Sequence, residues 1–271
     1  MHLKRWLTAL VLIPLILLVL LKGGRLVFVV TMILINGLAQ WEFLGLFQQA
    51  ADRARKAKVL ILGSLLLLSF CTAASPQGRA LPLFVLVACL FILFLFYLLS
   101  YEYIQELVWD LAANTLGLLF LPLLLGHFIW LRYMPEGEWW ILWLLFVICS
   151  GDTAAYYTGR ALGQKKFYPQ VSPGKTWAGT WGGLAANVMI GVLAGLWFLS
   201  GVKFFSLILL GLVLGFIGLL GDLFVSMLKR RAQVKDSGAI LPGHGGMLDR
   251  LDSLLFTAPA LLYARLFIFQ V

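Results

Sequence analysis

The sequence predicts an all-α fold, a polytopic integral membrane helix bundle of about nine transmembrane helices. Hydrophobic residues make up 62% of the 271 positions and charged residues only 12%. Mean hydropathy is +0.95, and the apolar residues are gathered in long runs. Backbone groups inside a bilayer must be satisfied within the chain, which leaves helices or a closed barrel. No run shows the alternating pattern of barrel strands, so we expect helices.

Nine apolar runs account for the predicted spans, and some are shorter than the roughly 20 residues that a span needs. They cover residues 6–21, 26–47, 59–72, 81–99, 111–131, 139–150, 179–199, 204–221 and 254–269. We expect one membrane domain over residues 1–271, with N-terminal helices in 1–150 and catalytic helices and cytoplasmic loops in 151–271.

The basic residues indicate how the chain is oriented. With nine spans, 15 of the 21 Lys and Arg residues fall on the side of the N-terminus and the even-numbered loops. The side richer in Lys and Arg usually faces the cytoplasm. We therefore expect a bacterial inner-membrane protein with a cytoplasmic N-terminus, and with the polar stretches 151–178 and 222–253 in the cytosol. No soluble domain could present the net charge of +9 to a nucleic acid, so no such partner is expected.

The stretch 221–253 is the most polar part of the chain. It contains four aspartates, five basic residues, a histidine and a Pro-Gly-His-Gly-Gly turn. The aspartates are Asp222, Asp236, Asp249 and Asp252, and the basic residues are Lys229, Arg230, Arg231, Lys235 and Arg250. Carboxylates beside bases and glycines, next to apolar helices, suit a metal ion and a phosphate better than packing.

Asp222 and Asp249 are the candidate metal ligands. Asp222 follows an apolar run and shares a helical face with Ser226, Lys229 and Arg230. Asp249 opens the last helix, where a carboxylate could instead cap the helix N-terminus. A carboxylate near hydrocarbon is costly without a partner. A hard cation with oxygen ligands, Mg²⁺ above all, would remove the repulsion between the two and bridge to phosphates.

The basic residues and the glycine turn predict a phosphate-binding surface. Lys229 and Arg230 could alternatively be an ordinary positive-inside anchor. Gly245 and Gly246 would let backbone N–H groups approach an anion closely. His244 in the same turn could act as an acid, a base or a hydrogen-bond donor, and the sequence does not choose.

A second polar stretch carries Asp152, Tyr156 and the sequence Ser-Pro-Gly-Lys-Thr-Trp at 172–177. Gly-Lys-Thr is found in P-loops, but the required earlier glycine is replaced by Pro169 and no strand is expected before it. We therefore predict no P-loop, only a lysine and two hydroxyls suited to a nucleotide phosphate. Asp152 could hold a ribose, a base or a second metal ion.

Two further features leave alternatives open. Glu42, between Trp41 and Phe43, could be functional because a carboxylate in a span is costly, or could simply lie at the interface. The pairs Gly179/Gly183, Gly191/Gly195 and Gly211/Gly215 predict close packing of the helices that carry them, and the alternative is that glycines are simply common in membrane helices.

The sequence from Ser226 to Asp252 resembles the signature of the phosphatidate cytidylyltransferase (CDP-diacylglycerol synthase) family. It reads SMLKRRAQVKDSGAILPGHGGMLDRLD. The segment 172–177, Asp152 with Tyr156, the Gly-Asp-Leu at 221–223 and the Trp-Glu at 41–42 are also similar to that family. Ala178 and Val225 depart from it, since many relatives have a polar residue at each position.

The resemblance implies Mg²⁺-dependent transfer of a cytidylyl group from CTP to phosphatidate, giving CDP-diacylglycerol and pyrophosphate. The implied catalytic residues are Asp222, Asp249, Lys175, Lys229 and Arg230. Residues expected to contact substrate are Asp152, Tyr156, Ser172, Thr176, Ser226, Lys235, Asp236, His244, Gly245, Gly246, Arg250 and Asp252. The alternatives are a CTP-dependent lipid kinase and an ion-coupled transporter. The expected partners are the two substrates and membrane lipid, and the sequence leaves a homodimer open.

Overall fold

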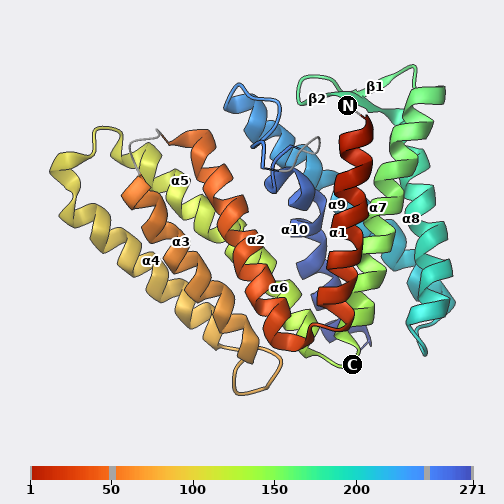
Figure 1. The fold of residues 1–271 in the computed structure, drawn as a ribbon, viewed down its shortest axis with the longest axis horizontal. Helices are drawn as coiled ribbons and strands as arrows, with labels where there is room; N and C mark the ends of the chain where they lie inside the picture. The colour runs from red at the N-terminus through yellow and green to blue at the C-terminus, as the bar shows by residue number, and fades with distance from the viewer. Residues whose placement is uncertain (1, 49–52, 241–244, 270–271) are drawn as a thin grey trace. The chain divides into compact units, whose positions relative to one another are not determined.

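The computed structural model describes residues 2–48, 53–240 and 245–269. Its helices and strands, in chain order, are α1 (His2–Leu21), α2 (Gly24–Phe47), α3 (Arg53–Ser69), α4 (Leu81–Leu99), α5 (Leu107–Phe120), α6 (Pro122–Tyr133), α7 (Gly137–Leu162), β1 (Lys166–Tyr168), β2 (Ser172–Thr176), α8 (Trp177–Phe198), α9 (Phe204–Arg231) and α10 (Leu248–Ala264). Short 3₁₀ turns follow α3 and α4, and a π-helical turn, Arg265–Phe269, follows α10. Figure 1 shows these elements along the chain.

The apolar runs form helices, as the sequence predicts. Seven helical stretches within the described residues are long and apolar enough to cross a membrane, so the chain is a polytopic membrane protein. One of them, Leu107–Tyr133, contains both α5 and α6, which meet at Leu121 just before Pro122. Proline starts a helix readily but cannot continue one, which explains the break. The number nine remains a prediction, because α1 and α3 are not among the seven.

The polar stretches are more regular than expected. α7 continues through Asp152 to Leu162, and α9 continues through Asp222 to Arg231. Residues 166–176 form an antiparallel two-stranded hairpin in which Lys166 pairs with Thr176 and Tyr168 with Ser172. The prediction that no strand precedes Gly174-Lys175-Thr176 is therefore wrong. The P-loop is still absent, because the triplet lies inside β2 and the position for the first glycine is Pro169.

The chain forms two compact units. The first contains residues 1–134 and 236–250, and the second contains residues 135–235 and 251–271. In the first unit, buried amides join helices that are far apart in sequence. Gln40 of α2 donates to the carbonyl oxygens of Val59 and Gly117, at 3.3 and 3.4 Å. Asp110 accepts a hydrogen bond from the Tyr97 hydroxyl. It also forms an ion pair with Arg55, whose Nη1 lies 2.6 Å from Asp110 Oδ2.

In the second unit, glycines allow α7, α8 and α9 to pack closely. A Cβ added at Gly211 of α9 would lie 2.8 Å from the carbonyl oxygen of Asn187 on α8. One added at Gly191 would lie 3.6 Å from the Cα of Gly211. Close packing of the predicted glycine pairs is confirmed, with one refinement. Gly179 and Gly183 face α7 rather than α9, since their nearest neighbours include the carbonyl oxygens of Ala155 and Gly151.

The hairpin lies at one end of α7 and α8 (Figure 1). α8 begins immediately after β2, and Thr176 caps it, because the Thr176 hydroxyl oxygen accepts a hydrogen bond from the Gly179 N–H at 3.1 Å. An added Cβ at Gly159 of α7 would lie 3.0 Å from that same hydroxyl oxygen. The cap therefore both ends the strand and fixes the hairpin against α7.

Candidate active site

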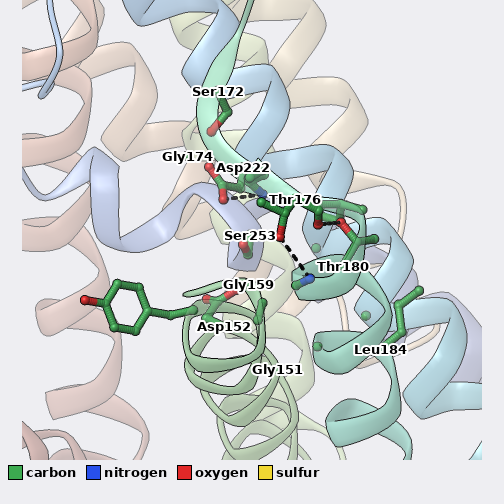
Figure 2. A pocket seen from close by; sticks show the side chains of 18 of the residues that line it. Gly151, Asp152, Gly159, Ser172, Gly174, Thr176, Thr180, Leu184, Asp222 and Ser253 are labelled. Carbon is green, nitrogen blue, oxygen red and sulfur yellow. Dashed lines mark hydrogen bonds and ion pairs between the residues drawn. The ribbon is translucent and has the colours of Figure 1, made fainter. Parts of the chain in front are cut away.

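A cavity of about 560 Å³ lies within the second unit, between α7, the hairpin, α8 and α9. Six of the residues singled out from the sequence line it: Asp152, Tyr156, Ser172, Lys175, Thr176 and Asp222. They come from three separate elements, α7, β2 and α9, so their gathering is a result of the fold. Figure 2 shows Asp222, Thr176, Asp152 and Ser253 around this cavity.

Asp222 is held from two sides. The Lys175 ammonium nitrogen lies 2.6 Å from Oδ2, and the Ser226 hydroxyl donates to Oδ1 at 3.1 Å. Ser226 lies one turn further along α9, as the helical spacing predicted. The Lys175 and Asp222 side chains are 23% and 27% exposed, so a ligand in the cavity can reach both.

The charges of two other aspartates act on Asp252 in this unit. Asp252 of α10 experiences the negative charges of Asp222 and Asp152, and the positive charge of Lys229. Its Oδ1 accepts a hydrogen bond from the Ser253 N–H at 2.8 Å. Like-charged carboxylates raise the energy of their ionised forms unless a cation compensates them. Lys175 and Lys229 provide part of that compensation.

The cavity contains residues that the sequence analysis missed. Arg160 of α7 and Lys166 of β1 line it beside Lys175, and Asn187 of α8 forms part of its wall. Among the described side chains, Asn187 Oδ1 is one of the buried oxygens without a hydrogen-bond partner. A lone asparagine in an otherwise apolar run was the available signal. Arg160 and Lys166 gave none, because residues 151–178 were expected to be a loop.

The bases at the end of α9 make contacts within the protein. Arg230 donates from Nε to the carbonyl oxygen of Val171 and from Nη1 to that of Val234, both at 3.2 Å. Arg230 thereby joins α9 to the turn that precedes β2. Lys229 is 9% exposed and Lys235 is exposed. Val225, one of the two departures from the family pattern, is fully buried.

The remaining predicted residues belong to the first unit. Asp249 Oδ2 accepts hydrogen bonds from the N–H groups of Ser237 and Gly246, both at 2.9 Å, and from the Ser237 hydroxyl at 3.1 Å. The Gly246 N–H therefore already has a protein acceptor. Gly245 has φ +80°, and Asp236 and Arg250 are exposed. His244 lies outside the described residues.

The cavity's side chains suit a divalent cation that also binds phosphate oxygens of a substrate. Within the described residues, no group of three or more His, Cys, Asp and Glu side chains is arranged to hold a metal ion alone. Mg²⁺ seldom needs such a cage, since it is usually held by one or two carboxylates together with water and substrate phosphates. Asp222 lines the cavity, and its carboxylate offers the hard oxygen atoms that such a site would use.

Residues 3–268 of the chain match the cytidylyltransferase family. The chain belongs to this family. A phosphatidate cytidylyltransferase from Staphylococcus aureus strain COL is 34% identical over 259 residues, which is 95% of this chain and 96% of that protein. The phosphatidate cytidylyltransferases of Bacillus subtilis strain 168 and Helicobacter pylori strain 26695 are 39% and 41% identical over 155 and 139 residues.

The chain spans about half the length of several of the curated relatives that it matches. The alignment covers 58% of the B. subtilis protein and 51% of the H. pylori protein. The family assignment inferred from residues 226–252 is thus confirmed.

Proposed function

We propose that this cytidylyltransferase transfers the cytidylyl group of CTP to phosphatidate, giving CDP-diacylglycerol and pyrophosphate. The observation that carries the proposal is the second unit's cavity, where three bases and two aspartates lie beside apolar side chains. The bases are Arg160, Lys166 and Lys175, the acids are Asp152 and Asp222, and Ile148, Leu184 and Leu219 are among the apolar residues. A triphosphate and a lipid need such a combination.

The cavity residues would act mainly by charge neutralisation and positioning. A lipid phosphate oxygen attacks the α-phosphorus of CTP, the bond from that phosphorus to the bridging oxygen breaks, and pyrophosphate leaves. A phosphate monoester is largely ionised near neutral pH, so its oxygen needs no strong base. Lys175, with Arg160 and Lys166 on the same wall, would stabilise the negative charge that accumulates on the leaving phosphates.

The proposed ligands of Mg²⁺ are Asp222 and Asp249. A bound Mg²⁺ would neutralise phosphate charge and orient the triphosphate. In the second unit, Ser226 and Lys175 orient Asp222. In the first unit, Ser237 and Gly246 orient Asp249. Lys229 and Arg230 remain proposed phosphate contacts, and Arg230 would have to exchange a carbonyl partner for a phosphate.

The proposed location is the cytoplasmic face of a bacterial inner membrane, with the N-terminus in the cytosol. The support is the excess of Lys and Arg on that side of the nine-span topology. The charged end of α9, with Lys229, Arg230 and Arg231 in its last turn, is placed there as well. CTP would therefore enter from the cytosol and phosphatidate from the adjoining leaflet.

The experiment that tests the reaction follows the phosphates of CTP. Purified protein in detergent is given phosphatidate, Mg²⁺ and CTP labelled at either the α- or the γ-phosphate. We expect the α-label in a lipid and the γ-label in pyrophosphate. A γ-label in the lipid, with CDP released, would establish the lipid kinase instead. If neither form of labelled CTP gives a labelled lipid, both enzymatic activities are contradicted. The ion-coupled transporter would then be the remaining alternative.

A further inference from the structure

Glu42, near the end of α2, is a buried carboxylate bound to a distant part of the same unit. It is 6% exposed. Its Oε1 accepts a hydrogen bond from the Met247 N–H at 3.0 Å, and its Oε2 accepts one from the Leu248 N–H at 3.0 Å. The Ser237 hydroxyl also lies 3.1 Å from Oε2. The donors and the acceptor are about 200 residues apart in sequence.

The two backbone donors belong to the start of α10. The first N–H groups of a helix have no partner within it and carry its partial positive charge. A nearby side chain usually satisfies them, but here α2 supplies the carboxylate. Asp249 satisfies the preceding N–H, that of Gly246. The Ser237 hydroxyl is 3.1 Å from an oxygen of each carboxylate, so it couples Glu42 to Asp249.

Two glycines of the segment 236–250 lie directly on Glu42. A Cβ added at Gly238 would overlap Oε1, and one added at Gly246 would overlap Oε2 and the Ser237 hydroxyl. The backbone must approach the carboxylate this closely for its N–H groups to reach the two oxygens. These glycines therefore serve the contact with Glu42, a role distinct from the phosphate binding expected of Gly246.

We propose that Glu42 is a positioning residue, which holds the described ends of the segment 236–250, and with them Asp249, in the arrangement that cytidylyl transfer requires. The proposal rests on the proposed function for its catalytic consequence. Its physical basis is the two-oxygen acceptor. A glutamine in the same place offers one oxygen, and its amide N–H would face a backbone N–H, so one helix-start donor loses its acceptor.

Kinetics and local exchange test the proposal together. In Glu42→Gln, we expect kcat/KM for CTP to fall about 10- to 100-fold, a size typical for loss of a group that orients a ligating side chain. The fall should lie mostly in kcat, with KM for phosphatidate unchanged. Amide hydrogen exchange should rise in the peptides that contain Ser237, Met247 and Leu248, and stay unchanged elsewhere.

A double-mutant cycle provides the second measurement. Gly238→Ala should lower kcat/KM strongly in the wild-type background, because the new methyl group overlaps the carboxylate. In the Glu42→Ala background the same change should cost little more, since the space is then open. Gly45→Ala is the matched control, because Gly45 lies on α2 with Glu42 and a Cβ added there has nothing within 4 Å.

The outcomes separate the proposal from its alternatives. Wild-type kcat/KM and wild-type exchange in Glu42→Gln would overturn it. Faster exchange throughout the chain would also overturn it, since Glu42 would then support the fold generally. If wild-type protein transfers no cytidylyl group, the proposed function fails. In that case, unchanged exchange in the peptides that contain Ser237, Met247 and Leu248 would also overturn the positioning role of Glu42, and a rise confined to them would support it.

Discussion

Lys175 and Asp222 form an ion pair on the wall of the cavity, from elements 47 positions apart in the chain. Both side chains are partly exposed, so the pair contributes little to stability and is available to a charged ligand. Sequence reasoning selected both residues, Asp222 from its place after an apolar run and Lys175 from a turn-like segment. It could not pair them, because spacing along a helix carries no information about contacts between a strand and a helix.

Replacing Lys175 tests the charge of the cavity wall. Lys175→Gln should reduce kcat/KM for CTP about 100-fold, because the triphosphate loses one neutralising cation. Lys175→Arg keeps the charge and should retain more activity than the glutamine variant. Lys203→Gln, which changes an exposed lysine just before α9, is the control and should match the wild type. Steady-state assays of the four proteins decide this, and equal losses in the arginine and glutamine variants would contradict a role for charge.

Thr176 offers a residue-scale test of stability. Thr176→Val removes the hydroxyl that caps α8 while keeping the size of the side chain, and should lower the free energy of unfolding by about 1 kcal/mol. Thr176→Ser keeps the hydroxyl and should lose less. Unfolding of the purified variants in SDS titrations measures the difference. A valine variant as stable as the wild type would mean that the bond to Gly179 contributes nothing.

The helices were predictable from apolar runs, but their ends were not. α7 and α9 continue about three turns beyond the apolar residues that indicate them, to Leu162 and Arg231. Hydropathy marks where lipid ends, whereas backbone hydrogen bonding continues for as long as packing supports it. Gly151, Gly159 and Gly179 supply that support by letting α7 and α8 remain in contact beyond the apolar part. Residues 151–162, which were expected to belong to a loop, therefore form the last turns of α7.

The α8–α9 contact provides an element-scale prediction. Gly211→Ala should destabilise the protein by about 1–3 kcal/mol, because the methyl group meets backbone atoms of Asn187 and Val188 that cannot rotate away. Gly37→Ala on α2, where the added Cβ has nothing within 4 Å, should leave stability unchanged or slightly higher. Thermal unfolding followed in parallel for both variants checks the contrast. If Gly211→Ala changed the stability no more than Gly37→Ala, α8 and α9 would be able to move apart at no cost in free energy.

The whole chain illustrates why family membership was easier to infer than the site. The segment 226–252 identifies the family by its order of residues alone, and the match over residues 3–268 confirms that inference. The same segment does not reveal which side chains hold it in place. Glu42 lies far away in sequence, and only the folded chain shows its contact with Met247 and Leu248. Residues that act across long sequence separations leave no local pattern.

The orientation in the membrane can be tested at this scale. After Cys71, Cys89 and Cys149 are replaced by serine or alanine, single cysteines are placed at Lys235 and Lys203, both exposed. The positive-inside rule predicts that Lys235→Cys reacts with a membrane-impermeant maleimide in inverted vesicles and Lys203→Cys in intact spheroplasts. The reverse pattern would place the charged end of α9 outside the cytosol. Labelling of both cysteines in one preparation would place Lys203 and Lys235 on the same side, and would contradict the prediction that α9 crosses the membrane between them.

The most direct measurement of the central claim is transfer of a labelled α-phosphate from CTP to phosphatidate by Asp222→Asn, beside wild type and Glu102→Gln. Glu102 is an exposed carboxylate of the first unit and serves as the matched control. We expect a loss of about 100-fold or more in Asp222→Asn, since the cavity loses the proposed charged ligand for Mg²⁺, and none in Glu102→Gln. Transfer by Asp222→Asn at the wild-type rate would contradict it.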